Sequence, residues 1–356
     1  MMMSATELQQ KVKQGEVIEN LILSGINLST CDLAGGIFRQ VDFSNADFTG
    51  CNLDHCLFIA CTLTAGIFTQ TRLQHASFSE SDLSRANFSG AHLSTLIFSE
   101  CNLQQADFSH IQGEILQFME CSLEQGRFQH AQLSKSAISG SSLKECDFTA
   151  AKLFKTTFYQ IDMREYIPTG AGFEQVNFFE CLQQGLDYQG LSFIQCQFTR
   201  NQLDDVNFAS AILNRCLFQG ASLQRANLRE VQAEYTQFIE ADLSQADCRA
   251  SLMSQSMWIS ARLSSTHFEC CQLARALFSK SLALGALFTD AQLEYADFSY
   301  ANISQANFKG ARFNRTQFHR SIQVETLWGD KTGMLENDPE LFAAESWAQS
   351  EQLANR

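Results

Sequence analysis

The sequence predicts an all-β solenoid, a fold in which the chain winds many times around one continuous apolar interior. Three observations lead to this fold class. Large apolar residues recur every five residues, this period runs from residue 23 to residue 318 without an insertion or deletion, and Leu alternates with Phe along much of it. All three features are visible in "SDLSRANFSGAHLSTLIFSECNLQQADFSH", residues 81–110, which has Leu or Phe at positions 83, 88, 93, 98, 103 and 108.

The five-residue period excludes the ordinary secondary structures. In an α-helix each apolar residue would be turned about 140° from the last, which scatters the set around the helix. In a flat strand an odd spacing sends alternate apolar residues to opposite faces. Only a repeated turn of the chain every five residues directs all of them to one interior, as in a solenoid.

The central residue of each five-residue unit falls at a position ending in 3 or 8. Sixty such positions lie between Leu23 and Phe318, and forty-eight of them hold Leu or Phe. The residue two before each centre is typically small, and two mostly polar residues follow the centre. Phe dominates positions ending in 8 and Leu those ending in 3, so an even number of units per coil keeps like residues stacked. The alternation therefore favours two, four or six sides.

The individual units resemble the A(D/N)LXX units of the pentapeptide-repeat family. The resemblance extends over roughly residues 21–328 and is carried by units such as "ADFTG", "CNLDH", "SDLSR", "ANFSG", "ADLSQ", "ADFSY" and "ANFKG". It implies a right-handed quadrilateral β-helix with twenty residues in each coil. On this basis we expect about 15 coils.

Both ends of the repeat region need covers, because each coil contacts only its neighbours. Residues 1–20 form the predicted N-terminal cap, with a helix over residues 5–14 that begins at the capping-box pair Ser4 and Glu7. Residues 329–356 form a C-terminal acidic segment, in which Asp338-Pro339 starts a helix containing Leu341, Phe342 and Trp347. This second helix is either a plain end cap or a contact that docks a second copy into a homodimer.

The repeat region, residues 21–328, is irregular at about residues 161–190. Pro168 and Gln183 occupy centres there, and Gly113, Ala233 and Ala283 replace Leu or Phe elsewhere. Because Pro cannot donate a hydrogen bond to a ladder, we expect a bulge or kink near Pro168. The irregular stretch is interpreted either as a tolerated defect or as a bend that shapes a binding surface.

The composition indicates in which compartment the protein is expected and which classes of partner are disfavoured. Eleven of the thirteen Cys occupy the small position before a centre, where a free Cys acts as a small hydrophobe. This use of Cys predicts a reducing cytoplasm. No apolar leader or long apolar run is present, so no membrane association is expected. The formal net charge of −14 disfavours direct nucleic-acid binding.

No motif for catalysis is found in the sequence. A phosphate-binding Gly loop, a nucleophile elbow and a CxxC pair are all missing, so we predict no enzyme, no catalytic residue and no cofactor. His55 with His75, and His110 with His130, are predicted to stack one coil apart. No further ligand obviously completes either site, and no metal site is predicted.

Apolar residues that should face solvent collect on one Phe-rich side, whose centres are 38, 58, 78 and onward. We predict a partner-binding surface there, formed by Ile37, Leu57, Ile59, Ile97, Met119, Tyr159, Phe179, Leu217, Ile239, Met257, Ile259 and Leu277. The matching positions on the opposite Phe side are mostly polar, with Ile67, Ile167 and Leu287 as exceptions. The alternative is that these residues are β-formers tolerated on a strand.

Charges also separate by side. One Leu side carries many basic residues and the opposite Leu side many acidic ones, with counter-charges on both. The basic set is His55, Arg72, His75, Lys135, Lys152, Lys155, Arg215, Arg275, Arg312 and Arg315. We interpret both Leu sides as ordinary charged faces in contact with solvent.

These features lead to two hypotheses for function. The first is a non-enzymatic scaffold or adaptor that presents a rigid side to a partner protein of unknown identity. The opening "LQQKVKQGEVIENLILSGINLSTCDLAGGIF" is similar to pentapeptide-repeat accessory proteins of bacterial type VI secretion clusters, which implies a secretion-related role. The second hypothesis, implied by resemblance to family members that protect DNA gyrase, is inhibition by DNA mimicry. The chain differs from those members in its greater repeat number, its lack of an inserted loop and its acidic C-terminal helix.

Overall fold

The structure is a computed structural model that describes residues 3–354, with side chains through residue 348. It divides into two compact units, Met1–Leu182 (unit 1) and Gln183–Arg356 (unit 2). The division falls inside residues 161–190, the stretch in which the repeat is irregular. Each unit is described by itself below.

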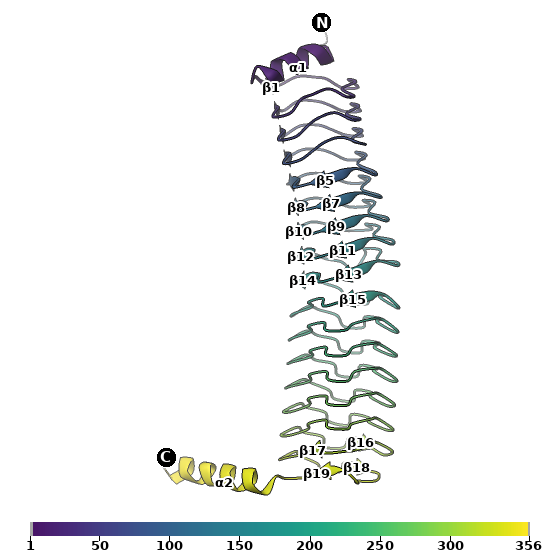
Figure 1. The fold of residues 1–356 in the computed structure, drawn as a ribbon, viewed down its shortest axis with the longest axis vertical. Helices are drawn as coiled ribbons and strands as arrows, with labels where there is room; N and C mark the ends of the chain where they lie inside the picture. Colours follow the sequence, from purple (N-terminus) through teal and green to yellow (C-terminus); the bar gives the residue numbers. More distant parts are fainter. Residues whose placement is uncertain (1–2, 355–356) are drawn as a thin grey trace. The chain divides into compact units, whose positions relative to one another are not determined.

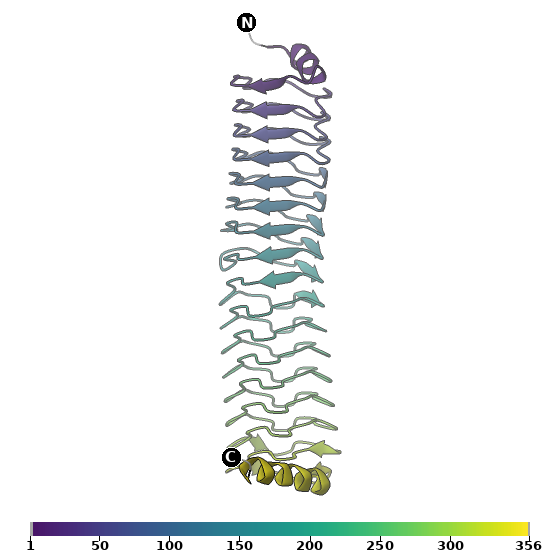
Figure 2. The same cartoon turned by 90° about the vertical axis from the view of Figure 1, so that its left-hand side faces the viewer.

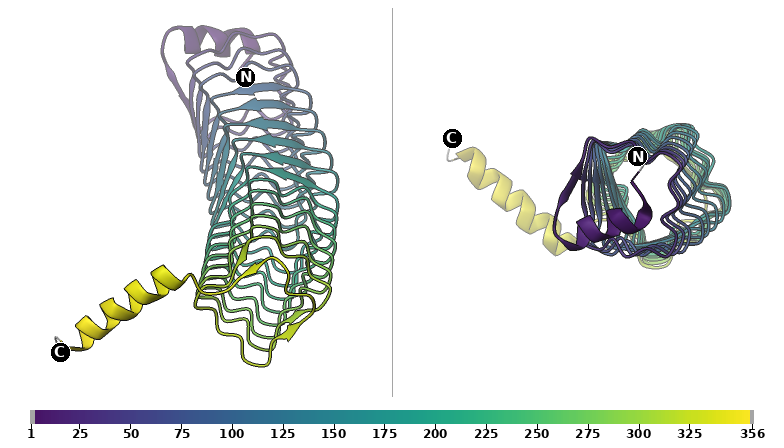
Figure 3. Two further views of the ribbon diagram at one scale, coloured as in Figure 1. Left: turned by 60° about the horizontal axis from the view of Figure 1, so that its bottom comes forward. Right: turned by 90° about the horizontal axis from the view of Figure 1, so that it is seen from above.

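Unit 1 is a right-handed, four-sided parallel β-helix with twenty residues in each coil (Figures 1 and 3). One side is a nine-stranded sheet whose strands pair in register at intervals of twenty residues, as Phe38 does with Phe58. Figure 2 shows these strands as a stack of parallel arrows. They are β1 (Val17–Glu19), β2 (Ile37–Arg39), β3 (Leu57–Ile59), β4 (Ser77–Ser79), β6 (Ile97–Ser99), β8 (Gln117–Met119), β10 (Ala137–Ser139), β12 (Thr157–Tyr159) and β14 (Asn177–Phe179).

A second side of unit 1 carries another parallel ladder. Its strands in this unit are β5 (His92–Ser94), β7 (Gln112–Glu114), β9 (Gln132–Ser134), β11 (Lys152–Phe154) and β13 (Gly172–Glu174). The remaining sides are held by isolated parallel bridges with the same interval, such as Asp42 with Thr62. The twenty-residue coil expected from the repeat is therefore confirmed.

Helix α1 (Ala5–Lys13) covers the first coil of unit 1 (Figure 3). Ser4 and Glu7 form the predicted capping box, and the helix ends one residue before the expected boundary. Leu8 and Val12 are buried against the coil. The Gln9 side-chain oxygen accepts a hydrogen bond from the Asp32 backbone N–H at 3.1 Å, which pairs an otherwise open donor of the first coil.

The Asp or Asn that precedes many centres has a local role in the turns. The Asp42 carboxylate accepts the Ser44 backbone N–H at 2.8 Å, and Asp82 accepts the Ser84 N–H at 2.9 Å. This bond from a side chain to the backbone two residues later stabilises a turn. The corner residues that follow adopt a positive φ at nearly every coil, as at His55 with 61°.

Stacked aromatic rings line two sides of the interior over most coils, and Leu lines much of the other two sides. Phe58 and Phe78 stack with ring centroids 4.7 Å apart, Phe68 and Phe88 stack at 4.6 Å, and the two columns meet edge to face. These rings are fully buried. Burial of one Phe contributes about 1.5–3 kcal/mol, so the ladders are the main source of stability.

The Cys residues at the small position are packing residues. Of the thirteen, eleven are buried, Cys31 is half-buried and Cys270 is exposed, and all are free thiols. Inward thiols donate to the carbonyl 23 residues earlier, as Cys146 does to Leu123 at 2.8 Å. Burial raises the pKa of the Cys56 and Cys146 thiols to about 12, which keeps them protonated and unreactive.

The register is kept at Pro168, and the departure from the regular coil lies in the turn just before it. The Glu145 N–H donates to the Glu165 carbonyl at 3.2 Å, where other corners bond the residue one earlier, and Glu165 lacks the positive φ of the other corners. Asp147 pairs with Ile167 and Asp162 pairs with Leu182, both at the regular interval of twenty residues. The Ile167 N–H donates to the Cys146 carbonyl at 2.8 Å, and the Ile167 carbonyl accepts the Phe148 N–H at 2.8 Å. Because the neighbouring residue keeps both ladder bonds, Pro168 fits the buried centre without a shift in register.

Unit 2 repeats the same twenty-residue coil, mostly through isolated bridges such as Ser192 with Ile212. Its strands are β15 (Ser192–Ile194), β16 (Asn307–Phe308), β17 (Thr316–Gln317), β18 (Leu327–Trp328) and β19 (Met334–Leu335). The Trp328 ring stacks on Phe308 at 4.9 Å and meets Phe318 edge to face at 5.4 Å. Trp328 thereby covers the aromatic core at the last coil.

Helix α2 (Pro339–Ala354) follows the last coil of unit 2 (Figure 1). Its predicted start is confirmed, since the Asp338 carboxylate accepts the Leu341 backbone N–H at 2.9 Å. Leu341, Phe342 and Trp347 remain exposed. Among residues 3–354, neither helix has the length and apolar character needed to span a membrane.

Candidate functional site

The seven predicted partner-binding residues of unit 1 all lie on outward positions of the nine-stranded sheet. They are Ile37 on β2, Leu57 and Ile59 on β3, Ile97 on β6, Met119 on β8, Tyr159 on β12 and Phe179 on β14. Leu57, Met119, Tyr159 and Phe179 are exposed, whereas Ile37, Ile59 and Ile97 are half-buried between neighbouring coils. The partial burial follows from the close spacing of about 4.8 Å between parallel strands.

The surface of this sheet has two concentrations of apolar side chains. The first, the N-terminal patch, consists of Val17, Ile37, Leu57 and Ile59. Val17 precedes the repeat and was not predicted, although its place in "GEVIENL" continues the same column. Ser77 and Ser79 of β4 follow the patch, so the predicted stripe is interrupted at that coil.

The second concentration is the aromatic pair, Tyr159 and Phe179. Their rings stack with centroids 5.7 Å apart, and the two residues are 39% and 40% exposed. They are paired through β12 and β14 in register. Two large rings held in a fixed geometry on a flat sheet are typical of binding hot spots, because little conformational entropy is lost when a partner covers them.

The five predicted residues of unit 2 form a separate half-buried cluster. Met257 pairs with Leu277 in one column and with Gln237, which separates Met257 from Leu217. Ile239 and Ile259 occupy the column on the other side of the centre, where the Glu240 N–H donates to the Ile259 carbonyl at 3.0 Å. None of the five reaches the exposure of the aromatic pair.

The predicted His columns also form. His55 stacks on His75 with centroids 5.0 Å apart, and His110 stacks on His130 at 4.9 Å. Within the described residues no group of three or more His, Cys, Asp or Glu is arranged to hold a metal ion.

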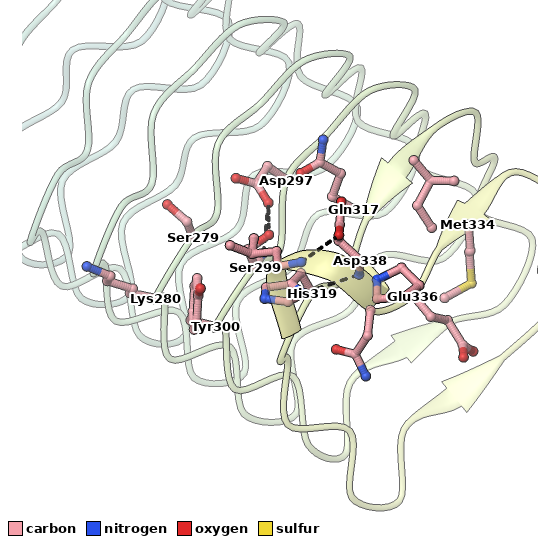
Figure 4. A pocket seen from close by; sticks show the side chains of 14 residues that line it. Ser279, Lys280, Asp297, Ser299, Tyr300, Gln317, His319, Met334, Glu336 and Asp338 are labelled. Carbon is pink, nitrogen blue, oxygen red and sulfur yellow. Dashed lines mark hydrogen bonds between the residues drawn. The ribbon is translucent and has the colours of Figure 1, made fainter. Parts of the chain in front are cut away.

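A groove of about 680 Å³ lies in unit 2, where the segment leading into α2 crosses the last coils (Figure 4). The buried His319 anchors it, because its Nδ1 accepts the Asp338 backbone N–H at 3.3 Å and its Nε2 lies 3.2 Å from Glu345. Tyr300 and Arg320 contact the same Glu345 carboxylate. This groove was not predicted from the sequence. The groove forms where the segment that leads into α2, which has no repeat pattern, packs on the last coils.

The contacts of Glu345 shift two pKa values in opposite directions. The hydrogen bond from Tyr300 is the largest cause that lowers the pKa of the Glu345 carboxyl, because the bond stabilises the carboxylate. The same bond raises the pKa of the Tyr300 hydroxyl, which must keep its proton to donate. Glu345 thus ties α2 to the last coils through three side chains.

Comparison with known proteins agrees with the repeat pattern. A family model described as a pentapeptide repeat region matches residues 21–88 and 52–128, and one described as pentapeptide repeats (8 copies) matches residues 202–234, 211–247 and 286–322. Together these matches cover more than half of the chain. No curated protein is significantly similar to the sequence.

Several solved structures are similar at low sequence identity. HetL from the cyanobacterium Nostoc, a pentapeptide-repeat protein involved in heterocyst differentiation regulation, is 19% identical over 74% of this chain and 90% of its own, with a TM-score of 0.19. Full-length QnrB1, a plasmid-mediated fluoroquinolone resistance protein, is 14% identical over 76% and 96%, with a TM-score of 0.15. A pentapeptide-repeat protein from the Arabidopsis thaliana thylakoid lumen is 22% identical over 36% and 70%, with a TM-score of 0.12.

Proposed function

Because the chain belongs to the pentapeptide-repeat family, we propose that it is a non-enzymatic scaffold that binds a partner protein through the nine-stranded sheet of unit 1. The observation that carries this proposal is the exposed, stacked aromatic pair, Tyr159 and Phe179. The N-terminal patch is a second, separate apolar area on the same sheet. A reducing cytoplasm suits the buried thiols, and a secretion-related role stays a prediction.

The test is affinity capture from the native cell, followed by titration of the captured protein against purified chains. Changing Tyr159 and Phe179 together to Ser is expected to weaken binding by at least tenfold, since hot-spot aromatics typically contribute 2 kcal/mol or more. Circular dichroism and the melting temperature check that the variant remains folded.

The matched control changes Ile67 and Ile167 to Ser, because both are exposed apolar residues of unit 1 outside the nine-stranded sheet. This control is expected to bind like the unmodified chain. Equal binding by the control and the aromatic-pair variant would contradict the proposal.

DNA mimicry is the second candidate, and the net charge of −14 favours it. Mimicry needs a face of unbroken negative potential. Ion pairs such as Arg127 with Asp107 in unit 1 and Arg249 with Asp247 in unit 2, each at 2.6 Å, interrupt the acidic columns. We therefore rank the scaffold first, and potent inhibition of purified DNA gyrase in a supercoiling assay would reverse the order.

We also propose that α2 docks a second copy of the chain. Leu341 and Phe342 are 46% and 41% exposed although the helix is held beside unit 2 by Glu345. Light scattering after size exclusion is expected to give twice the chain mass of 39.9 kDa, falling to one chain mass when Leu341 and Phe342 are changed to Ser. The control Leu282→Ser removes a similarly exposed side chain elsewhere in unit 2 and should leave the mass unchanged.

A further inference from the structure

One corner of the coils in unit 2 carries a single file of arginine, tyrosine and glutamine. We call it the Arg/Tyr ridge, and its residues are Arg215, Tyr235, Gln255, Arg275, Tyr295 and Arg315. Each has a positive φ between 52° and 61°, as the corner of a coil requires. Successive coils are bonded at this corner, for example by the Tyr295 N–H to the Asn314 carbonyl at 2.7 Å. The residues are therefore spaced by about 4.8 Å.

Contacts between neighbours order the side chains along the ridge. The Arg215 guanidinium lies 5.5 Å from the Tyr235 ring centroid, and the Arg275 guanidinium lies 5.8 Å from that of Tyr295. The Gln255 side chain donates to the Tyr235 hydroxyl at 2.8 Å. Tyr235 and Tyr295 nevertheless remain 46% and 47% exposed. Such cation–π contacts hold the groups in place without hiding them.

The arginines of the ridge keep their charge available. Within the described residues, Arg215, Arg275 and Arg315 make no ion pair, whereas Arg225 and Arg249 in the same unit each bind a carboxylate. Glu234 and Glu294 directly precede Tyr235 and Tyr295 in the chain, and within the described residues neither forms an ion pair with an arginine of the ridge. The ridge is therefore a local positive strip on a chain whose net charge is −14.

We propose that the Arg/Tyr ridge binds an extended acidic segment of another protein, laid along the direction in which the coils stack. Arginine forms forked, charge-assisted hydrogen bonds with carboxylates, and Arg and Tyr are the residues most enriched in binding hot spots. A peptide is favoured over a nucleic acid, because a single-stranded nucleic acid binds by stacking its bases on open aromatic faces, and Arg215 and Arg275 already lie over the rings of Tyr235 and Tyr295.

The spacing of the arginines indicates the pattern of the acidic segment. Arg215 and Arg275 are three coils apart, which is about 14 Å, and Arg275 and Arg315 are two coils apart, which is about 10 Å. An extended peptide advances about 3.3 Å per residue. Residues an even number apart lie on the same face of an extended peptide, so carboxylates four residues apart would meet Arg215 and Arg275 together.

The test measures fluorescence anisotropy of three labelled probes at low salt: a 16-residue oligoglutamate, a Gly/Ser peptide of equal length and a 16-nucleotide oligothymidylate. The unmodified chain is expected to bind oligoglutamate, to ignore the Gly/Ser peptide and to bind the oligonucleotide more weakly. Changing Arg215 and Arg275 together to Gln is expected to reduce the affinity for oligoglutamate by at least tenfold.

The control changes Arg200 and Arg262 together to Gln. Both are exposed arginines of unit 2 that lie off the ridge, and the change in net charge is the same. A loss below threefold is expected for this control. Equal losses in the two double variants, no binding of oligoglutamate, or tighter binding of oligothymidylate would each overturn the proposal.

Discussion

Replacing Trp258 by Ala is expected to lower the free energy of unfolding of unit 2 by about 3–5 kcal/mol. The Trp258 side chain is fully buried at a position where most coils hold Phe. Its ring stacks on Phe238 at 4.2 Å and on Phe278 at 5.7 Å, and it meets Phe268 edge to face at 5.2 Å. Truncation leaves a cavity in the column that neighbouring rings cannot fill, because the backbone ladder holds them in place. Urea unfolding followed by circular dichroism measures the loss.

Trp258→Phe is the matched control, since it keeps a ring in the column. It removes the hydrogen bond from the indole N–H to the Ser256 hydroxyl at 2.7 Å, but Ser256 still donates to the Met253 carbonyl at 2.6 Å. No buried donor is left unpaired, so a cost of about 1 kcal/mol is expected. If the Ala variant were no less stable than the Phe variant, the stacked column would not be the source of stability.

Replacing Gly113 by Leu is expected to destabilise unit 1 by about 1–3 kcal/mol, although Leu is the residue that the repeat calls for at a centre. Leu116, at a position that is usually small, occupies the space. A Cβ atom built at Gly113 would lie 2.6 Å from Leu116 Cδ1 and 3.1 Å from Leu133 Cδ2. The midpoint of urea unfolding should therefore fall in this variant.

The double variant Gly113→Leu with Leu116→Ala restores the usual large and small order of the unit. It is expected to recover stability to within about 1.5 kcal/mol of the unmodified chain, as a volume-conserving exchange does. Leu116→Ala alone should cost about 2–5 kcal/mol, since it leaves a cavity. A double-mutant cycle with no coupling between the two sites would contradict this account of the interior.

The fold could be predicted because every five-residue repeat carries the same local sequence pattern. A large residue at each centre, a small residue two before it and an Asp or Asn between them specify the direction of the chain within five residues. The Asp42 and Asp82 side chains show how the Asp or Asn acts, since each accepts a hydrogen bond from the backbone N–H two residues later. The register is kept at Pro168 for the same reason, because the loss of one donor is small against a register that many coils hold.

The candidate surface could be predicted in part. Residue number modulo twenty sorts outward side chains by side, and this placed Tyr159 and Phe179 on the nine-stranded sheet. The same sorting does not predict how much of each side chain is exposed, because the exposed fraction depends on the side chains in the preceding and following coils. Ile37 and Ile97 are thus half-buried, whereas Leu57 in the same column is exposed.

The sequence by itself determined the winding of the chain, the lining of its interior and the side on which each residue lies, because these follow from a five-residue period that each unit satisfies locally. Only the tertiary structure decided how Leu116 replaces the missing side chain at Gly113, how Glu345 ties α2 to Tyr300 and His319, and which arginines keep their charge free. These features depend on contacts between residues that no repeat relates, and a periodic pattern carries no information about such contacts.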